Sequence, residues 1–93
     1  MRRYKTRLGV VLTTIADQYY LVAAKSIREL CPYASQINET AAFCWKALEE
    51  GADLDELEEK VSAEYDIADL EELRKDLESL LAQLLEKNYL IES

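Results

Sequence analysis

The chain has 93 residues, a length that suits one domain, and 49% of them are hydrophobic while 32% are charged. This composition can form one modest core and is not typical of a disordered chain. The net charge of −8 disfavours binding to nucleic-acid phosphates, and the absence of histidine disfavours a zinc site. No apolar run approaches the roughly 20 residues of a membrane span, so we expect a cytoplasmic protein without membrane contacts.

The charge is distributed unevenly along the chain. Residues 1–28 carry six basic side chains and one acidic one, whereas residues 39–93 carry seventeen acidic and five basic side chains. We predict a flexible basic tail over residues 1–7. The whole chain, residues 1–93, is predicted to be one domain.

The first third of the chain has the pattern of β-strands. Leu8–Ile15 is apolar and β-branched without helical spacing, and Tyr19–Ala23 is a second run of strand-favouring residues. The intervening Ala16–Gln18 is predicted to be the turn of a hairpin. Lys25–Leu30 is ambiguous and could form a helical turn.

Pro32 ends that ambiguous segment, because a proline pushes the residue before it out of the helical conformation. Ser35–Ile37 is then predicted to form a third short strand. Tyr89–Ile91, at the other end of the chain, is predicted to be an apolar extended tail.

The last two thirds of the chain have the apolar spacing of three helices. The predicted ranges are Glu39–Glu50, Leu54–Tyr65 and Leu70–Lys87. Each range follows a residue that caps helix N-termini well, namely Asn38, Asp53 and Asp69. The fold class is therefore α+β, with an N-terminal three-stranded antiparallel sheet packed on a three-helix bundle.

Three conspicuous side chains are expected to be structural. Trp45 lies on the apolar face of the first predicted helix and is assigned to the core. Cys31 and Cys44 are predicted to be reduced, partly buried thiols rather than a disulfide or metal ligands.

The segment Gln36–Trp45 resembles the central signature of the PqqD-like family. That pattern is an apolar residue, Asn, a variable position, Thr or Ser, Ala, and then an apolar pair ending in Trp or another large residue. The family comprises recognition elements for ribosomally made, post-translationally modified peptides. Further matches at family-like spacing are Gly51, Asp53–Val61, Glu64–Asp66, Asp76, Leu77, Leu80, Leu84 and Asn88–Ile91.

The resemblance implies a winged-helix-like fold and a non-enzymatic, peptide-binding function without a cofactor. In such a protein the leader of a precursor peptide adds as a strand to the exposed edge of the third strand, beside the third helix. The implied partners are that precursor peptide and a maturation enzyme such as a radical SAM protein.

The candidate peptide-binding residues come from the third strand and the third helix. They are Ser35, Gln36, Ile37, Arg74, Glu78, Leu81 and Leu85. On the helical wheel Leu81 and Leu85 widen the apolar arc beyond a simple core stripe, and Arg74 lies at its margin. We expect both leucines to form the groove floor and Arg74 to anchor an acidic leader residue. In the alternative, both leucines pack under the hairpin and Arg74 pairs with Glu78 or Glu71.

Two other function classes are weighed against this one. A winged-helix transcription regulator would use the third helix for DNA recognition. The exposed face of that helix is mostly acidic, which disfavours this alternative: Glu71, Glu72, Lys75, Glu78, Gln83 and Glu86. An enzyme is disfavoured because the sequence has no histidine, glycine-rich phosphate loop or nucleophile–base pair.

Overall fold

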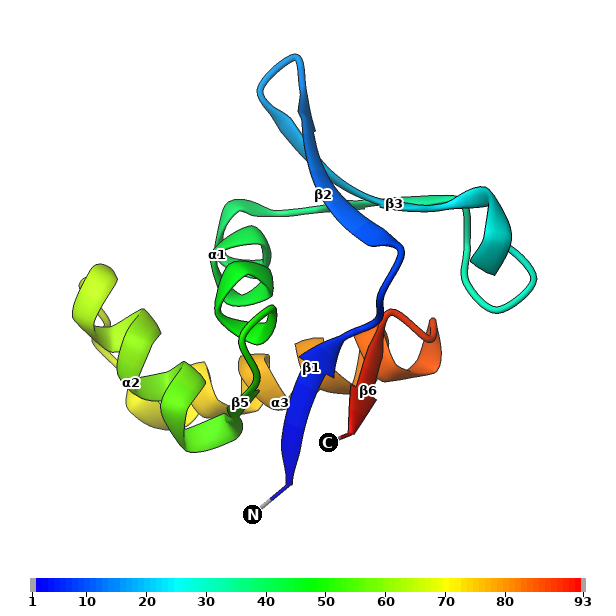
Figure 1. Ribbon diagram of the computed structural model, residues 1–93. Helices are drawn as coiled ribbons and strands as arrows, with labels where there is room; N and C mark the ends of the chain where they lie inside the picture. The colour runs from blue at the N-terminus through cyan, green and yellow to red at the C-terminus, as the bar shows by residue number, and fades with distance from the viewer. Residues whose placement is uncertain (1, 93) are drawn as a thin grey trace.

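The computed structural model describes residues 2–92, which form three α-helices, a single 3₁₀ turn and two three-stranded sheets (Figure 1). The predicted α+β class is confirmed. The elements in chain order are β1 (Arg3–Thr6), β2 (Val10–Ile15), β3 (Gln18–Ala23), η1 (Lys25–Ile27), β4 (Ala34–Ile37), α1 (Glu39–Leu48), β5 (Ala52–Asp53), α2 (Leu54–Glu64), α3 (Leu70–Glu86) and β6 (Leu90–Glu92).

The predicted hairpin and third strand are confirmed as the antiparallel sheet β2-β3-β4. The hairpin turn consists of Ala16 and Asp17, both with positive φ, as the tight two-residue turn between twisted strands requires. β4 pairs with β3 from Val22↔Ala34 to Tyr19↔Ile37 and lies at one edge of the sheet. The hairpin tip extends away from the helices (Figure 1).

The three predicted helices are confirmed to within two residues at each end. The Asn38 side chain accepts a hydrogen bond from the Ala41 N–H at 2.8 Å. Asp53 and Glu56 form a reciprocal capping box at the start of α2. The Asp69 side chain accepts hydrogen bonds from the backbone N–H groups of Glu71 and Glu72 in the first turn of α3. Local capping therefore fixes where each helix begins.

A second sheet, in the order β5-β1-β6, was not predicted. The prediction of a flexible tail over residues 1–7 is wrong for Arg3–Thr6, which form β1 and pair with both β5 and β6. The Arg3 guanidinium also pairs with Glu56, whereas Met1 lies outside the described residues. Strands of two to four residues are too short to show the alternation that identifies a strand in sequence.

The core connects both sheets to all three helices. Its largest fully buried side chains are Trp45, Tyr89, Leu21, Leu48, Leu57, Leu77, Val61 and Cys44. The core position of Trp45 is confirmed. Cys31 and Cys44 are free, as predicted, and are more deeply buried than predicted. Among residues 2–92, no helix has the length and apolarity that a bilayer crossing requires.

Two leucines of α3 provide a matched test of this core. Leu81 is 4% exposed whereas Leu70 is 53% exposed. We expect Leu81→Ala to lower the free energy of unfolding by about 2–5 kcal/mol, because it leaves a cavity. Leu70→Ala is expected to lower it by less than about 1 kcal/mol. Urea denaturation measures both, and equal losses would contradict this placement of α3.

Candidate functional site

One side of the β4 backbone has no strand partner. The Ala23 N–H donates to the Tyr33 carbonyl at 2.8 Å, just before β4 begins. Opposite residues of an antiparallel pair alternate between hydrogen-bonded and non-bonded positions. From the register, Ser35 and Ile37 bond to β3, whereas the N–H and C=O groups of Ala34 and Gln36 point to the open side of the strand.

The side chains of β4 alternate in the same way. Ile37 packs against the core, and the Ser35 hydroxyl lies 2.9 Å from the hydroxyl oxygen of the buried Tyr89. Gln36 is directed away from the core, and its amide donates to the Gln18 side chain at 2.6 Å. The open edge therefore presents backbone groups beside a partly apolar surface.

A groove runs along α3 beside this edge, and it consists of two adjoining hollows. The small hollow, about 180 Å³, lies between β4 and α3 and is lined by Ser35, Gln36, Ile37, Asn38, Ala41, Leu80, Gln83, Leu84, Lys87 and Tyr89. The large hollow, about 540 Å³, continues between α1 and α3. Asn38, Ala41, Leu80 and Gln83 line both hollows, which makes the groove continuous.

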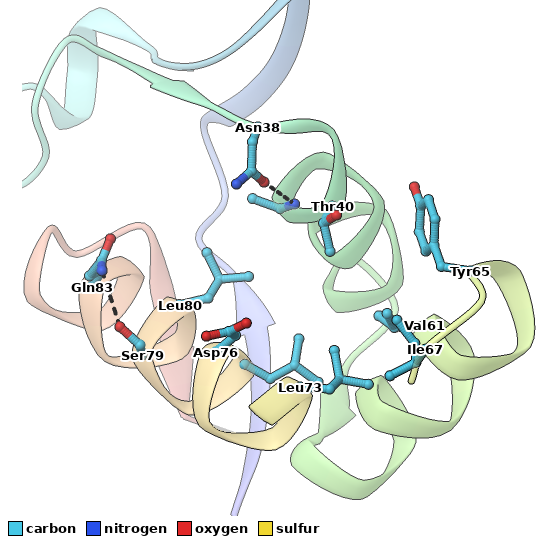
Figure 2. A pocket seen from close by; sticks show the side chains of 12 residues that line it. Asn38, Thr40, Val61, Tyr65, Ile67, Leu73, Asp76, Ser79, Leu80 and Gln83 are labelled. Carbon is cyan, nitrogen blue, oxygen red and sulfur yellow. Dashed lines mark hydrogen bonds between the residues drawn. The ribbon is translucent and has the colours of Figure 1, made fainter. Parts of the chain in front are cut away.

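The large hollow has an apolar floor and a polar rim (Figure 2). Ala41, Val61, Leu73, Leu77 and Leu80 supply the apolar surface. Tyr65 and Ile67, from the end of α2 and the α2–α3 connection, close one end. The remaining lining residues are polar: Asn38, Thr40, Asp76, Ser79 and Gln83. An extended segment with alternating apolar and polar side chains fits such a surface.

Tyr65 is held at the end of the groove by an aromatic contact. Its ring packs edge-on against Phe43 of α1, with ring centroids 5.6 Å apart. Burial raises the pKa of the Tyr65 phenol, and the nearby Glu39 and Glu64 raise it further. The phenol is therefore a neutral hydrogen-bonding group at neutral pH.

Tyr89 and Asn88 hold the connection that leads into β4. The fully buried Tyr89 hydroxyl donates to the Pro32 carbonyl at 2.9 Å and contacts Ser35. The Asn88 amide donates to the Leu30 carbonyl at 2.8 Å. These bonds tie the segment before β4 to the end of α3. β4 and the end of α3, which form the two sides of the small hollow, are thus held together.

The structure brings together only part of the predicted site. Ser35, Gln36 and Ile37 line the groove, as the sequence prediction requires, although binding to them stays a prediction. The four predicted residues of α3 do not line either hollow: Arg74, Glu78, Leu81 and Leu85. Their assignment to the groove beside β4 is therefore corrected.

Arg74 lies on the side of α3 that faces α2. Its guanidinium pairs with Asp55 at 2.9 Å and Glu58 at 2.8 Å, and more weakly with Glu78. Hydrogen bonds from Arg74 to Asp55 and Glu58 raise the pKa of the guanidinium. Leu81 is buried in the core, and Leu85 packs against it. On a helical wheel the apolar arc of α3 has two margins, and the sequence alone does not show which of them faces β4. The prediction chose the margin that faces away from β4.

The sequence prediction missed the residues of α3 that do line the groove. On the helical wheel Leu73, Asp76, Leu80, Gln83 and Lys87 lie together at the opposite margin of the apolar arc. Knowledge of the second sheet would have identified this margin, because α3 also contacts β6 and α2. The packing of α3 against β6 and α2 explains why its apolar arc extends to Leu81 and Leu85, and a groove at these two leucines is not needed to explain it.

The described residues offer little for covalent or metal chemistry. Burial raises the pKa of the Cys44 thiol to about 11, and burial also raises that of Cys31. Both thiols are therefore protonated and weakly nucleophilic at neutral pH. Within residues 2–92 no three His, Cys, Asp or Glu side chains gather closely enough to hold a metal ion. The arrangement is suited to binding.

A family model described as Coenzyme PQQ synthesis protein D (PqqD) matches residues 33–90. The chain belongs to the PqqD family. The matched range of this PqqD-family chain contains β4 and all three α-helices, so it includes both sides of the groove. The resemblance seen in Gln36–Trp45 is thereby confirmed. No curated protein is similar enough in sequence to count as a match.

Two solved structures resemble this PqqD-family chain over nearly its full length. One is described as TbiB1 in complex with the TbiA(beta) leader peptide; it is 26% identical, with a TM-score of 0.72, and the alignment covers 92% of this chain and 93% of that one. The other is a lasso peptide synthetase B1 complexed with the leader peptide, 18% identical, with a TM-score of 0.72 and coverage of 95% and 96%. The second likeness concerns the fold alone.

The Tyr89 hydroxyl can be tested with a matched pair of variants. Tyr89→Phe removes the partner of the Pro32 carbonyl and of Ser35, so we expect the free energy of unfolding to fall by about 1–2 kcal/mol. Amide exchange at Ser35 and Ile37 should also become faster. The control is Tyr33→Phe, since Tyr33 is 59% exposed. Equal stability of the two variants would show that the hydroxyl does not hold β4.

Proposed function

We propose that this chain is a non-enzymatic adaptor that binds the leader segment of a ribosomally synthesised precursor peptide. The leader adds as a strand to the open side of β4, and the adaptor presents the precursor to a modifying enzyme. The observation that carries the proposal is the pair of outward-pointing backbone positions, Ala34 and Gln36, directly beside the groove along α3.

The physical basis of this binding mode is strand addition. A free strand edge offers unpaired N–H and C=O groups, with which a peptide forms main-chain hydrogen bonds regardless of its sequence. Side-chain selectivity then comes from the adjoining surface, which here is the apolar floor and polar rim of the groove. A leader that is disordered when free loses entropy on binding, so we expect dissociation constants from micromolar to tens of nanomolar.

The same sheet has a second free edge at β2, but it is a poorer candidate. Leu12 and Thr14 of β2 point their backbone groups outward, as the bond from the Ala24 N–H to the Gly9 carbonyl and the register indicate. The hairpin that carries them extends away from the helices (Figure 1). Neither hollow of the groove is lined by a residue of β2. A peptide there would gain main-chain bonds with little side-chain selectivity.

The second proposed partner is the modifying enzyme, of which a radical SAM protein is one class. A leader held in the groove leaves the rest of the precursor free for chemistry elsewhere. We place this reaction in the cytoplasm, where precursors are synthesised and where thiols such as Cys31 and Cys44 stay reduced. The protonated thiols and the binding character of the groove support a non-catalytic role.

A backbone substitution tests the strand edge directly. Gln36→Pro removes the outward N–H, and we expect about tenfold weaker binding of a synthetic leader peptide that binds the unmodified protein, because one main-chain bond is lost. Proline is tolerated at an edge position whose N–H faces outward. Fluorescence anisotropy with the labelled leader measures the affinity.

Two controls separate the backbone effect from other effects. Gln36→Ala keeps the N–H and removes the side chain, so it should bind within about twofold of the unmodified protein. Arg74→Gln should also bind normally, because Arg74 faces α2 rather than the groove. Unchanged affinity for folded Gln36→Pro would overturn strand addition at β4.

A further inference from the structure

Four residues of α3 form a row along the groove, which is defined here as the recognition row: Asp76, Leu80, Gln83 and Lys87. Their spacing of four, three and four residues places them on one side of the helix. In Figure 2 the Asp76 carboxylate and the Leu80 side chain extend from α3 toward α1. The row therefore presents an acid, an apolar group, an amide and a base to anything bound in the groove.

The two charges lie at opposite ends of the recognition row. Asp76 is the one charged residue lining the large hollow, and Lys87 is the one charged residue lining the small hollow, among residues 2–92. Neither side chain forms an ion pair with any other residue in that range. Both charges are thus available to a bound peptide.

The charged residues near Asp76 add to its negative potential, whereas those near Lys87 add less to its positive potential. Next to Asp76, a shallow hollow is lined by three further carboxylates, from Asp66, Asp69 and Glu72, and by no base. Beyond Lys87, the neighbouring hollow contains Arg28 but also Glu29 and Glu86. The field at the acidic end is therefore one-sided, whereas the field at the Lys87 end is mixed.

We propose that the recognition row selects leader segments by charge, with a basic residue over Asp76 and, more weakly, an acidic residue over Lys87. This inference rests on the proposed function. Lys87 follows Asp76 by eleven positions, a distance of about 16 Å along the helix. An extended peptide covers this distance in about five residues. Side chains of a strand alternate between its two faces, so the two charges that face the recognition row are four or six positions apart.

The direction of the peptide follows from the direction of β4. Ser35 contacts Tyr89 beyond the end of α3, whereas Asn38 lies with Leu80 nearer the middle of the helix. β4 thus runs opposite to α3. Antiparallel strand pairs are somewhat more stable than parallel ones, so a peptide added to β4 is expected to run in the direction of α3. The basic residue then precedes the acidic one.

Selection from a displayed library of random 15-residue peptides tests this without a known ligand. Against the unmodified protein, we expect enrichment of Lys or Arg followed, four or six positions later, by Asp or Glu. Against Asp76→Lys, the preference at the first position should change to Asp or Glu. Such a reversal cannot arise from misfolding. Glu71→Gln, an exposed carboxylate outside the groove, should leave the enriched pattern unchanged.

Affinities of the enriched peptides complete the test. Asp76→Asn should weaken their binding about three- to fivefold at low salt, as one partly exposed ion pair is lost, and added salt should reduce the difference. Enriched peptides that bind at β4 without this charge pattern would overturn the charge selection and leave the proposed function standing. If no peptide is enriched, or if binding leaves the Ala34 and Gln36 amides unprotected, the proposed function fails as well.

Discussion

The backbone of β4 forms hydrogen bonds on one side only, and the other features of the site depend on this. Ser35 and Ile37 are bonded to β3, so Ala34 and Gln36 keep their donors and acceptors free. Buried strands do not tolerate unpaired groups, but an edge beside a groove can hold them until a peptide pairs with them. The Tyr89 hydroxyl keeps this edge next to α3 because it bonds to Ser35 and to Pro32, which lies in the irregular segment before β4.

In the proposed binding mode, β4 supplies most of the affinity for a peptide and the recognition row supplies most of the selectivity. Main-chain bonds at β4 are available to any extended peptide, whereas the recognition row on α3 contacts its side chains. Asp76 and Lys87 differ in charge and lie on the same side of one rigid helix, which fixes their separation. Exposed ion pairs contribute little energy individually, so the row discriminates between peptides more than it tightens binding.

Local chemistry made most of the fold predictable, and long-range contacts explain what was not. The helix starts could be predicted from their N-cap residues, because capping involves residues only two or three positions away. These N-caps are Asn38, Asp53 and Asp69. The edge strand Ser35–Ile37 was likewise visible. The pairing of β1 with β5 and β6 joins residues about fifty to ninety positions apart through very short strands, and no local pattern signals it. Without that sheet, Leu81 and Leu85 looked like surplus apolar surface, and Asp76 was noted only as a match to the family pattern.

Residue-resolved amide exchange on the protein with and without the leader peptide tests the central claim most directly. The sheet contains its own control, because Ala34 and Gln36 of β4 and Leu12 and Thr14 of β2 all point their N–H groups away from the sheet. All four amides should exchange quickly in the free protein. Strand addition at β4 predicts that the peptide slows exchange at Ala34 and Gln36 and leaves Leu12 and Thr14 unchanged. Protection confined to β2, or to α1 with β4 unaffected, would contradict this account.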